Sequence, residues 1–225
     1  QQKSNKLALH KKDLLKKAQR LQREQRIIRT NEELRDIYTA ILEIDRKNSS
    51  AITGMINVSN YDATLARIAI VARDYTRAQQ HISSIQSSTP RYAELGALAA
   101  ELELAKDNSK KADELLSEAK KILQSIKLGG EGRAQLIDVY STLQIVKKID
   151  SKNSQLPSVL ASLEDKYVSS IQQLMTTSNE EQLEYYFNDV AGKSWPTDRL
   201  FQLQLAHKNA VATKKKKPRV LTGGF

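Results

Sequence analysis

Residues 73–90 read RDYTRAQQHISSIQSSTP, and their pattern of apolar residues indicates the fold class. Its apolar residues Ala78, Ile82 and Ile85 are three or four positions apart, which places them on one face of a helix. Asp74 precedes the helix, and the Thr89-Pro90 pair follows it. The stretch therefore predicts a helix over about 75–87 with a short turn at each end.

The same helical periodicity continues in both directions from this stretch. The predicted helices are 4–28, 31 to about 46, 50–58, 62–73, 75–87, 91–106, 109–126, 132–149, 158–177, 180–191 and 197–210. Thr30 and Glu33 form a capping box that predicts a helix start near residue 31. No period-2 apolar segment with hairpin chemistry is found, so we predict an all-α protein. Short turns between helices of this length favour antiparallel hairpins.

A period of 34 residues relates the helix at 75–87 to its surroundings. The related pairs are Ala66 and Ala100, Ala78 and Ala112, Ile82 and Leu116, and Ile85 and Ala119. A fixed period of this length is typical of helical-repeat proteins, in which each hairpin buries its apolar face against the next one.

Residues 73–78, followed by Ile82, Ile85 and Pro90, resemble the turn, second helix and terminal proline of the tetratricopeptide-repeat (TPR) family. Similar but weaker segments begin at Asn31 and at Ser178. The resemblance implies stacked antiparallel hairpins that form a TPR-like α-solenoid. It also implies that small residues lie where helices approach closely, and these are Ala66, Ala78, Ala100 and Ala112.

The chain departs from the TPR pattern in several places, and a generic helical bundle is the alternative. Ile52 and Ile56 stand where the family usually has an aromatic residue and a glycine. Gly129, Gly130 and Gly132 fit no repeat frame and predict a helix C-cap and hinge. The predicted segments are a basic amphipathic helix (1–29), TPR-like repeats (30–126), an irregular hinge and long helix (127–157), degenerate helical hairpins (158–210) and a basic flexible tail (211–225).

The net positive charge of the chain comes from its two ends. The 225 residues carry 36 Lys and Arg against 26 Asp and Glu, a net charge of +10. Residues 1–29 and 211–225 hold more than this excess, so residues 30–210 are slightly acidic. The residues that could contact phosphate groups or an anionic surface are Lys11, Lys12, Lys16, Lys17, Lys214, Lys215, Lys216, Lys217 and Arg219. The last five also resemble a nuclear-localisation signal or a linker.

Signatures of catalysis and of metal binding are absent from the sequence. There is no cysteine, which excludes a disulfide framework, a cysteine-ligated metal and a cysteine nucleophile. The three histidines, His10, His81 and His207, are too scattered for a metal triad, and we expect them to be solvated or partly packed. Glu180, Glu181 and Glu184 are expected in the first turn of a helix. We predict no enzyme activity, no cofactor and no small-molecule substrate.

One group of aromatic residues stands out near the C-terminal end. It consists of Tyr185, Tyr186, Phe187 and Trp195. Packing in a helical hairpin is the favoured role, and an exposed anchor for a peptide is the alternative.

The TPR resemblance implies a concave groove, lined by first helices, that binds a peptide or a helix of a partner. The corresponding side chains are Asn60, Arg67, Glu94 and Glu101. They do not reproduce the Lys/Asn/Arg clamp with which some family members hold a terminal carboxylate. We therefore expect a non-catalytic protein-interaction scaffold, with a cytoplasmic location favoured and nuclear or membrane-tethered placement as alternatives. The alternative functions are a ribonucleoprotein component that contacts phosphates through its basic ends and a docking arm of a catalytic domain outside this segment.

Overall fold

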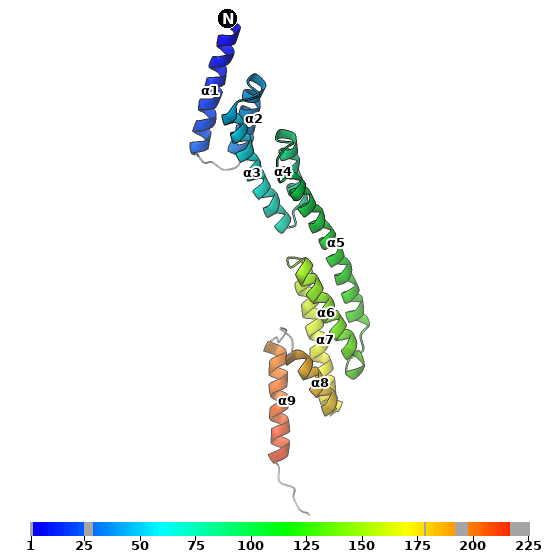
Figure 1. Cartoon of the computed structure of the whole chain (residues 1–225). Coiled ribbons are helices and arrows are strands. Elements are labelled where there is room, and N and C mark those ends of the chain that lie inside the picture. The colour runs from blue at the N-terminus through cyan, green and yellow to red at the C-terminus, as the bar shows by residue number, and fades with distance from the viewer. Residues whose placement is uncertain (1, 25–28, 178, 192–197, 217–225) are drawn as a thin grey trace, which may run out of the picture. The chain divides into compact units, whose positions relative to one another are not determined.

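The computed structural model describes residues 2–24, 29–177, 179–191 and 198–216, and these residues form helices without any strand (Figure 1). The prediction of an all-α protein is confirmed. The helices are α1 (Gln2–Glu24), α2 (Arg29–Ile44), α3 (Ser49–Val71), α4 (Tyr75–Ser88), α5 (Leu95–Ser125), α6 (Arg133–Ile149), α7 (Leu156–Thr177), α8 (Glu180–Ala191) and α9 (Asp198–Lys216), with a short 3-10 helix at Gly130–Gly132.

The chain divides into two compact units, Gln1–Asp107 and Asn108–Phe225. In the first unit, α2 packs against α1 and α3, and α4 packs against α3. One apolar cluster joins α1, α2 and the start of α3, and a second cluster joins the rest of α3 to α4 and the start of α5. The second cluster contains Ala66, Ala78, Ile82 and Ile85, so this part of the predicted core is confirmed.

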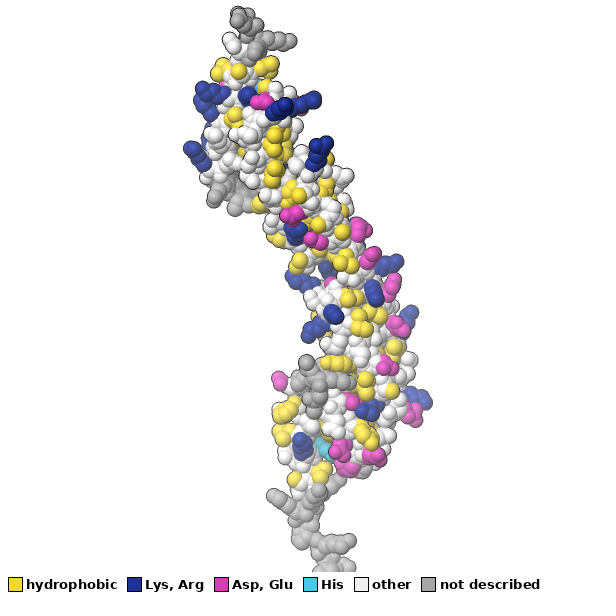
Figure 2. Space-filling view, viewed as in Figure 1, with side chains coloured by type: hydrophobic (Ala, Val, Ile, Leu, Met, Phe, Trp, Pro, Cys, Tyr) yellow, Lys and Arg dark blue, Asp and Glu magenta, His cyan; other side chains and the backbone are white. Residues whose placement is uncertain are grey.

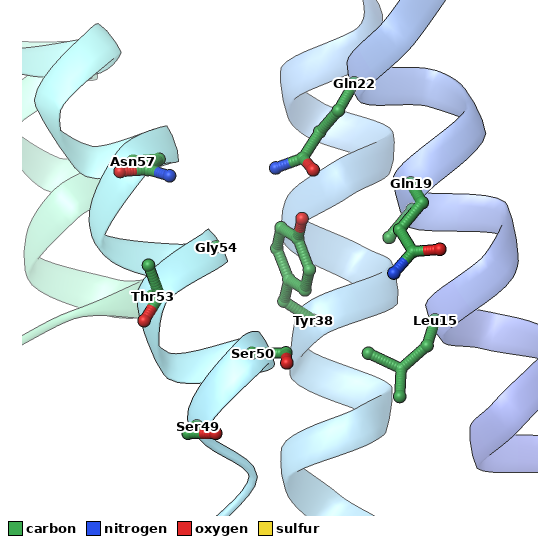
Figure 3. A pocket seen from close by; sticks show the side chains of 10 residues that line it. Leu15, Gln19, Gln22, Tyr38, Ser49, Ser50, Thr53, Gly54 and Asn57 are labelled. Carbon is green, nitrogen blue, oxygen red and sulfur yellow. The ribbon is translucent and has the colours of Figure 1, made fainter.

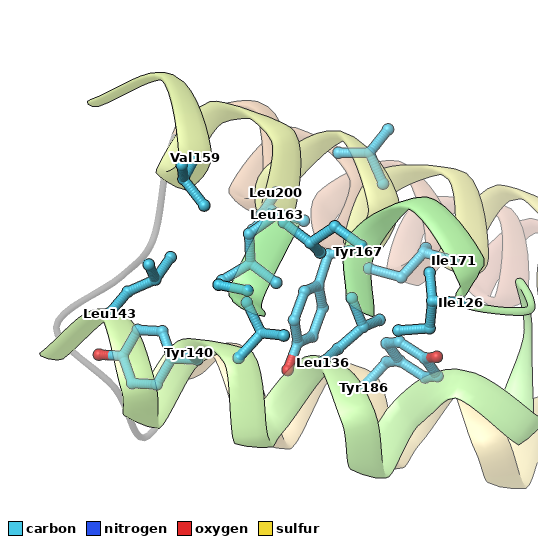
Figure 4. Close-up of a cluster of buried hydrophobic side chains, with 14 of the residues drawn as sticks. Ile126, Leu136, Tyr140, Leu143, Val159, Leu163, Tyr167, Ile171, Tyr186 and Leu200 are labelled. Carbon is cyan, nitrogen blue, oxygen red and sulfur yellow. The ribbon is translucent and has the colours of Figure 1, made fainter. Parts of the chain in front are cut away.

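The second unit has one continuous apolar core around α7, which contacts α6, α8 and α9 (Figure 4). Tyr167 and Tyr186 are both fully buried there, and their rings meet edge to face at 5.6 Å between centroids. The Tyr186 hydroxyl donates a hydrogen bond of 2.6 Å to the carbonyl of Gly129. Gly129 has a φ of 80°, a value that favours glycine. The predicted helix C-cap is misplaced, because α5 ends at Ser125, four residues before Gly129.

The two units contain the same turn between two helices. Residues 44–49 read IDRKNS and residues 149–154 read IDSKNS, so adding 105 to a residue number converts one into the other. In both turns the Asp amide binds a carbonyl four residues earlier, and the Asn amide binds the Asp carbonyl. The Asn side chain of each turn also reaches the Asp carboxylate, at 3.4 Å from Asn48 and 3.2 Å from Asn153.

The correspondence extends from this turn to the helices on both sides. When 105 is added to their residue numbers, α2, α3 and α4 correspond to α6, α7 and α8. The bounds of the paired helices agree within about two residues. Buried residues correspond as well: Leu34 with Val139, Tyr38 with Leu143, Ile41 with Val146, Val58 with Leu163, Ala66 with Ile171, and Ala78 with Leu183. Asp74 and Asn179, which also correspond, cap α4 and α8 by accepting hydrogen bonds from the amides of Arg77 and Gln182. The second unit therefore repeats the helix order and the packing of the first.

The two units differ at three corresponding positions, which are charged or polar in the first unit and tyrosine in the second. In the first unit, the Asp62 carboxylate accepts hydrogen bonds from Arg35 of α2 and pairs with His81 Nδ1 of α4 at 3.1 Å. In the second unit, the three corresponding residues are Tyr140, Tyr167 and Tyr186. An ionic link between three helices in one unit is thus replaced by aromatic packing in the other.

Several predicted helix boundaries are wrong. The predicted break between 58 and 62 does not exist, because Ser59 donates to the Met55 carbonyl inside α3 and Asp62 has partners on neighbouring helices. The break at Asp107-Asn108 is also absent, since α5 is continuous. Helix α2 begins at Arg29, so Thr30 lies within the helix, and α9 continues to Lys216 into the predicted tail.

One of the four predicted packing alanines is also placed wrongly. Ala66, Ala78 and Ala112 are fully buried, whereas Ala100 is exposed. The buried face of α5 carries Leu98 and Leu102 instead, and Ala100 lies two residues from each of them. Two positions correspond to a rotation of about 200° around a helix, which turns a side chain to the opposite face.

These two alanines provide a matched test of the packing. We expect Ala78→Leu to lower the thermal midpoint by about 2–8 °C, because extra methylene groups in a close-packed core cost about 1–3 kcal/mol. Ala100→Leu, the same chemical change at an exposed position, should alter stability by less than about 0.5 kcal/mol. Thermal unfolding followed by circular dichroism measures both, and equal midpoints for the two variants would contradict this assignment of the core.

Candidate functional site

The four predicted groove residues meet on the surface of the first unit. Arg67 of α3 donates from Nε and Nη2 to the two carboxylate oxygens of Glu101 on α5, at 3.0 and 3.1 Å. Its Nη2 also donates to Glu94 at 2.9 Å. These hydrogen bonds raise the pKa of Arg67 further above its already high value, so the guanidinium is always charged. Three of the four predicted groove residues are thus joined in one hydrogen-bonded network.

Asn60 joins the same surface through the connection between α4 and α5. Its side-chain oxygen accepts a hydrogen bond of 2.8 Å from the Tyr92 hydroxyl. One residue earlier in α3, the Ser59 hydroxyl donates to the Met55 carbonyl and accepts a hydrogen bond of 2.9 Å from the Thr89 hydroxyl. The connection from Thr89 to Glu94 is therefore held against α3 at both of its ends.

An apolar hollow of about 600 Å³ lies between α3 and this connection. We call it the apolar hollow. Its main lining residues are Leu42, Ile52, Met55, Ile56, Pro90 and Tyr92, together with Asn60 and Glu94 of the predicted groove. Ile52 and Ile56, one turn apart on α3, are each 42% exposed. Figure 2 shows hydrophobic side chains in a strip on this part of the molecule, with Lys or Arg side chains beside it.

The charges around the apolar hollow are unequally compensated. Arg67 pairs with both Glu94 and Glu101, so these three side chains together keep one negative charge. Arg91 also lines the hollow, is exposed and has no ion-pair partner among the described residues. The exposed apolar surface is thus accompanied by one uncompensated cation. The arrangement offers burial for an apolar group and a contact for a nearby acid, and no group positioned for catalysis.

The second unit shows that its fold does not need this surface. The residues that correspond to Ile52 and Ile56 are Pro157 and Ala161. Those that correspond to Asn60 and Glu94 are Asp165 and Arg199, which form an ion pair of their own at 2.5 Å. The same hairpin therefore folds without the two isoleucines, so their exposure in the first unit is not explained by helix packing.

The predicted anion-contacting residues are divided by the structure. Lys11 and Lys17 pair with Asp45 and Glu33 of the first unit, at 3.0 and 2.7 Å. The Lys11 hydrogen bond lowers the pKa of Asp45 below its ordinary value. Lys12 and Lys16 are exposed on α1, with no ion pair in the described part of the chain. Lys214, Lys215 and Lys216 belong to α9, but their side chains are not described, and Lys217 and Arg219 lie outside the described residues.

The aromatic group of the second unit is split between core and surface. Tyr186 and Phe187 are buried, as the packing interpretation predicts. Tyr185 is 47% exposed and lies under the Arg133 guanidinium, 5.1 Å from its ring centroid. Trp195 lies outside the described residues. Of the histidines, His10 is exposed, and His207 packs on Phe187 and pairs with Glu180 at 3.1 Å.

The described ranges contain neither a metal-binding cluster nor a membrane-spanning helix. No group of three or more His, Asp or Glu side chains in these ranges is arranged to hold a metal ion. No described helix is both long enough and apolar enough to cross a membrane. Comparison with known proteins finds no matching family model, no matching curated protein and no matching solved structure.

Sequence analysis did not recognise the apolar hollow, although a signal for it was present. Ile52 and Ile56 were noticed only as departures from a family pattern. When IDRKNS is aligned with IDSKNS, Ile52 and Ile56 are paired with Pro157 and Ala161. This pairing indicates that the hairpin does not require an isoleucine at either position. The contribution of Pro90 and Tyr92 depends on how the connection folds back onto α3, which no periodicity predicts.

Two arginines in comparable salt bridges test how much the Arg67 network stabilises the fold. Its side chains are 42–53% exposed, so we expect Arg67→Ala to lower the free energy of unfolding by less than about 1 kcal/mol. Arg133 binds Asp189 with two hydrogen bonds, and that aspartate is only 14% exposed. Arg133→Ala should therefore cost more, about 2 kcal/mol, because it leaves a largely buried carboxylate unpaired. Urea unfolding of both variants measures this order, and a larger loss for Arg67→Ala would refute it.

Proposed function

We propose that this protein is a non-catalytic interaction scaffold whose first unit binds a peptide or helix of a partner protein at the apolar hollow. The observation that carries this proposal is the exposure of Ile52 and Ile56 in a preformed hollow, at positions where the duplicate hairpin of the second unit has Pro157 and Ala161. An apolar surface that the fold does not require favours a binding role.

A TPR-like solenoid is the architecture that we propose for this scaffold. Three of the predicted 34-residue pairs support it, since Ala78 and Ala112, Ile82 and Leu116, and Ile85 and Ala119 are all buried. In each unit, most helices that follow one another in the chain also pack against one another, as stacked hairpins require. The exposed Ala100 shows that the 34-residue register does not extend through the first half of α5.

Binding would proceed by burial of an apolar side chain of the partner between Ile52, Ile56 and Pro90. Each buried aliphatic or aromatic side chain contributes about 1.5–3 kcal/mol when it leaves water. The hydrogen bond from Tyr92 to Asn60 and the one between Ser59 and Thr89 fix the shape of the hollow in the unbound chain. A preformed hollow reduces the entropy that is lost on binding.

The apolar hollow also indicates the charge of its partner. Arg91 is the uncompensated cation at the hollow, whereas Arg67 is already neutralised by two glutamates. A partner segment with an acidic residue near its apolar anchor would therefore fit better than a basic one. The ribonucleoprotein alternative rests, within the described residues, on the exposed Lys12 and Lys16 of α1.

Selection of peptides from a displayed random library, with the purified chain as bait, tests this function. We expect selected peptides to share an aliphatic or aromatic residue with a nearby Asp or Glu. Ile56→Asp should weaken their binding about tenfold or more, because it removes an apolar contact and introduces a charge into the hollow.

The matched control is Ile145→Asp, since Ile145 is an isoleucine of the second unit with 49% exposure. Binding should be unaffected by that change. Peptides that bind the Ile56→Asp and Ile145→Asp variants with equal affinity would show that the apolar hollow is not the binding surface. Circular dichroism of both variants establishes that they are folded.

A further inference from the structure

A second, polar hollow lies on the other side of α3 in the first unit (Figure 3). It has a volume of about 370 Å³ and lies among α1, α2 and α3. Its polar lining comes from Gln19, Gln22, Tyr38, Ser50, Thr53 and Asn57. None of these side chains has a hydrogen bond to another described residue, and none of the described residues that line the hollow is charged. We call it the polar hollow.

Tyr38 is the residue that makes this hollow unusual. The tyrosine is only 3% exposed, yet its hydroxyl has no hydrogen-bond partner among the described residues. Burial raises the pKa of Tyr38, so the hydroxyl stays protonated and can donate. In Figure 3 the Gln22 and Asn57 side chains point toward this hydroxyl from α1 and α3.

Gly54 makes room for the Tyr38 ring. A Cβ atom at this position would lie 2.2 Å from the Tyr38 Cζ atom, which is impossible without displacement of the ring. Glycine inside a helix costs about 1 kcal/mol relative to alanine. The first unit therefore combines a helix-weakening glycine with a buried tyrosine whose hydroxyl faces the hollow and bonds to no described residue.

The second unit closes the corresponding space with aliphatic side chains. Adding 105 takes Tyr38 to Leu143 and Gly54 to Val159, and both of these residues are buried. The hairpin thus packs well without a tyrosine and a glycine at these positions. The comparison indicates that the fold does not require the residues of the polar hollow, just as it does not require those of the apolar hollow.

We propose that the polar hollow is a binding site for an uncharged carboxamide, the side chain of a glutamine or asparagine presented by a polypeptide. The absence of a lining charge disfavours a carboxylate, a phosphate or an ammonium group, each of which would lose its hydration without compensation. A carboxamide offers two donors and an acceptor, which match the lining amides and hydroxyls.

The geometry also disfavours a sugar or a nucleobase. Such ligands need an open aromatic face for stacking, and the Tyr38 ring is covered by the α3 backbone at Gly54. The Tyr38 hydroxyl lies among the lining amides of Gln22 and Asn57, where the carboxamide of a side chain can exchange hydrogen bonds with all three groups. The site is separate from the apolar hollow and does not depend on the function proposed there.

Titration of the full chain with two blocked amino acids tests this site by nuclear magnetic resonance. The probes are N-acetyl-glutamine methylamide and N-acetyl-norleucine methylamide, which differ in a carboxamide and are similar in length. We expect saturable shifts of the Thr53, Gly54 and Asn57 amide signals with the glutamine probe, and at least about fivefold weaker binding of the norleucine probe.

Tyr38→Phe removes the hydroxyl and keeps the ring, so it tests the site without opening a cavity. It should weaken binding of the glutamine probe at least about fivefold and leave the thermal midpoint unchanged or higher, because no bond within the protein is lost. Tyr140→Phe in the second unit is the matched control and should leave binding unchanged. Equal affinities of the two probes, unaltered binding by Tyr38→Phe, or a lower thermal midpoint of that variant would overturn the proposal.

Discussion

Close packing along α3 is the constraint on which the first unit depends. The helix is buried on more than one side, against α2 at its start and against α4 along the rest of its length. Its buried residues are mostly small: Ala51, Gly54, Ala63, Ala66 and Ala69. Small side chains allow neighbouring backbones to approach, and the contacts between them then fix the order of the hairpins. The remaining α3 residues are left free to form a surface.

That surface carries both proposed sites. Ile52 and Ile56 face the apolar hollow, and Thr53 and Asn57 face the polar hollow. The two sets of residues alternate along α3, so one helix presents both the apolar anchor site and the amide site. The ionic contacts of Arg67 and the Tyr92 hydrogen bond to Asn60 hold the neighbouring connection in place. Exposed contacts of this kind add little stability but define the shape of the hollow.

The internal duplication distinguishes residues that the fold requires from residues that it does not. Both units keep the turn at Asp45 and Asp150 and an Asp or Asn cap at residues 74 and 179. The link of Arg35, Asp62 and His81 is replaced by three tyrosines, which shows that the same helix contacts tolerate ionic or aromatic chemistry. The first unit exposes Ile52 and Ile56 and packs Tyr38 on Gly54, at positions where the second unit has Pro157, Ala161, Leu143 and Val159.

The helical class, the existence and approximate position of most helices, and the burial of Ala66, Ala78 and Ala112 could be predicted from the amino-acid sequence. These features depend on spacing along one chain, and a 3.6-residue period is visible without knowledge of neighbours. Only the tertiary structure decided that Ser59 and Asp62 lie inside one continuous helix, because their polar groups find partners at Met55, Arg35 and His81. It also decided that Ala100 faces solvent and that Tyr38 opens into a hollow, since the exposure of a side chain depends on which helices pack beside it.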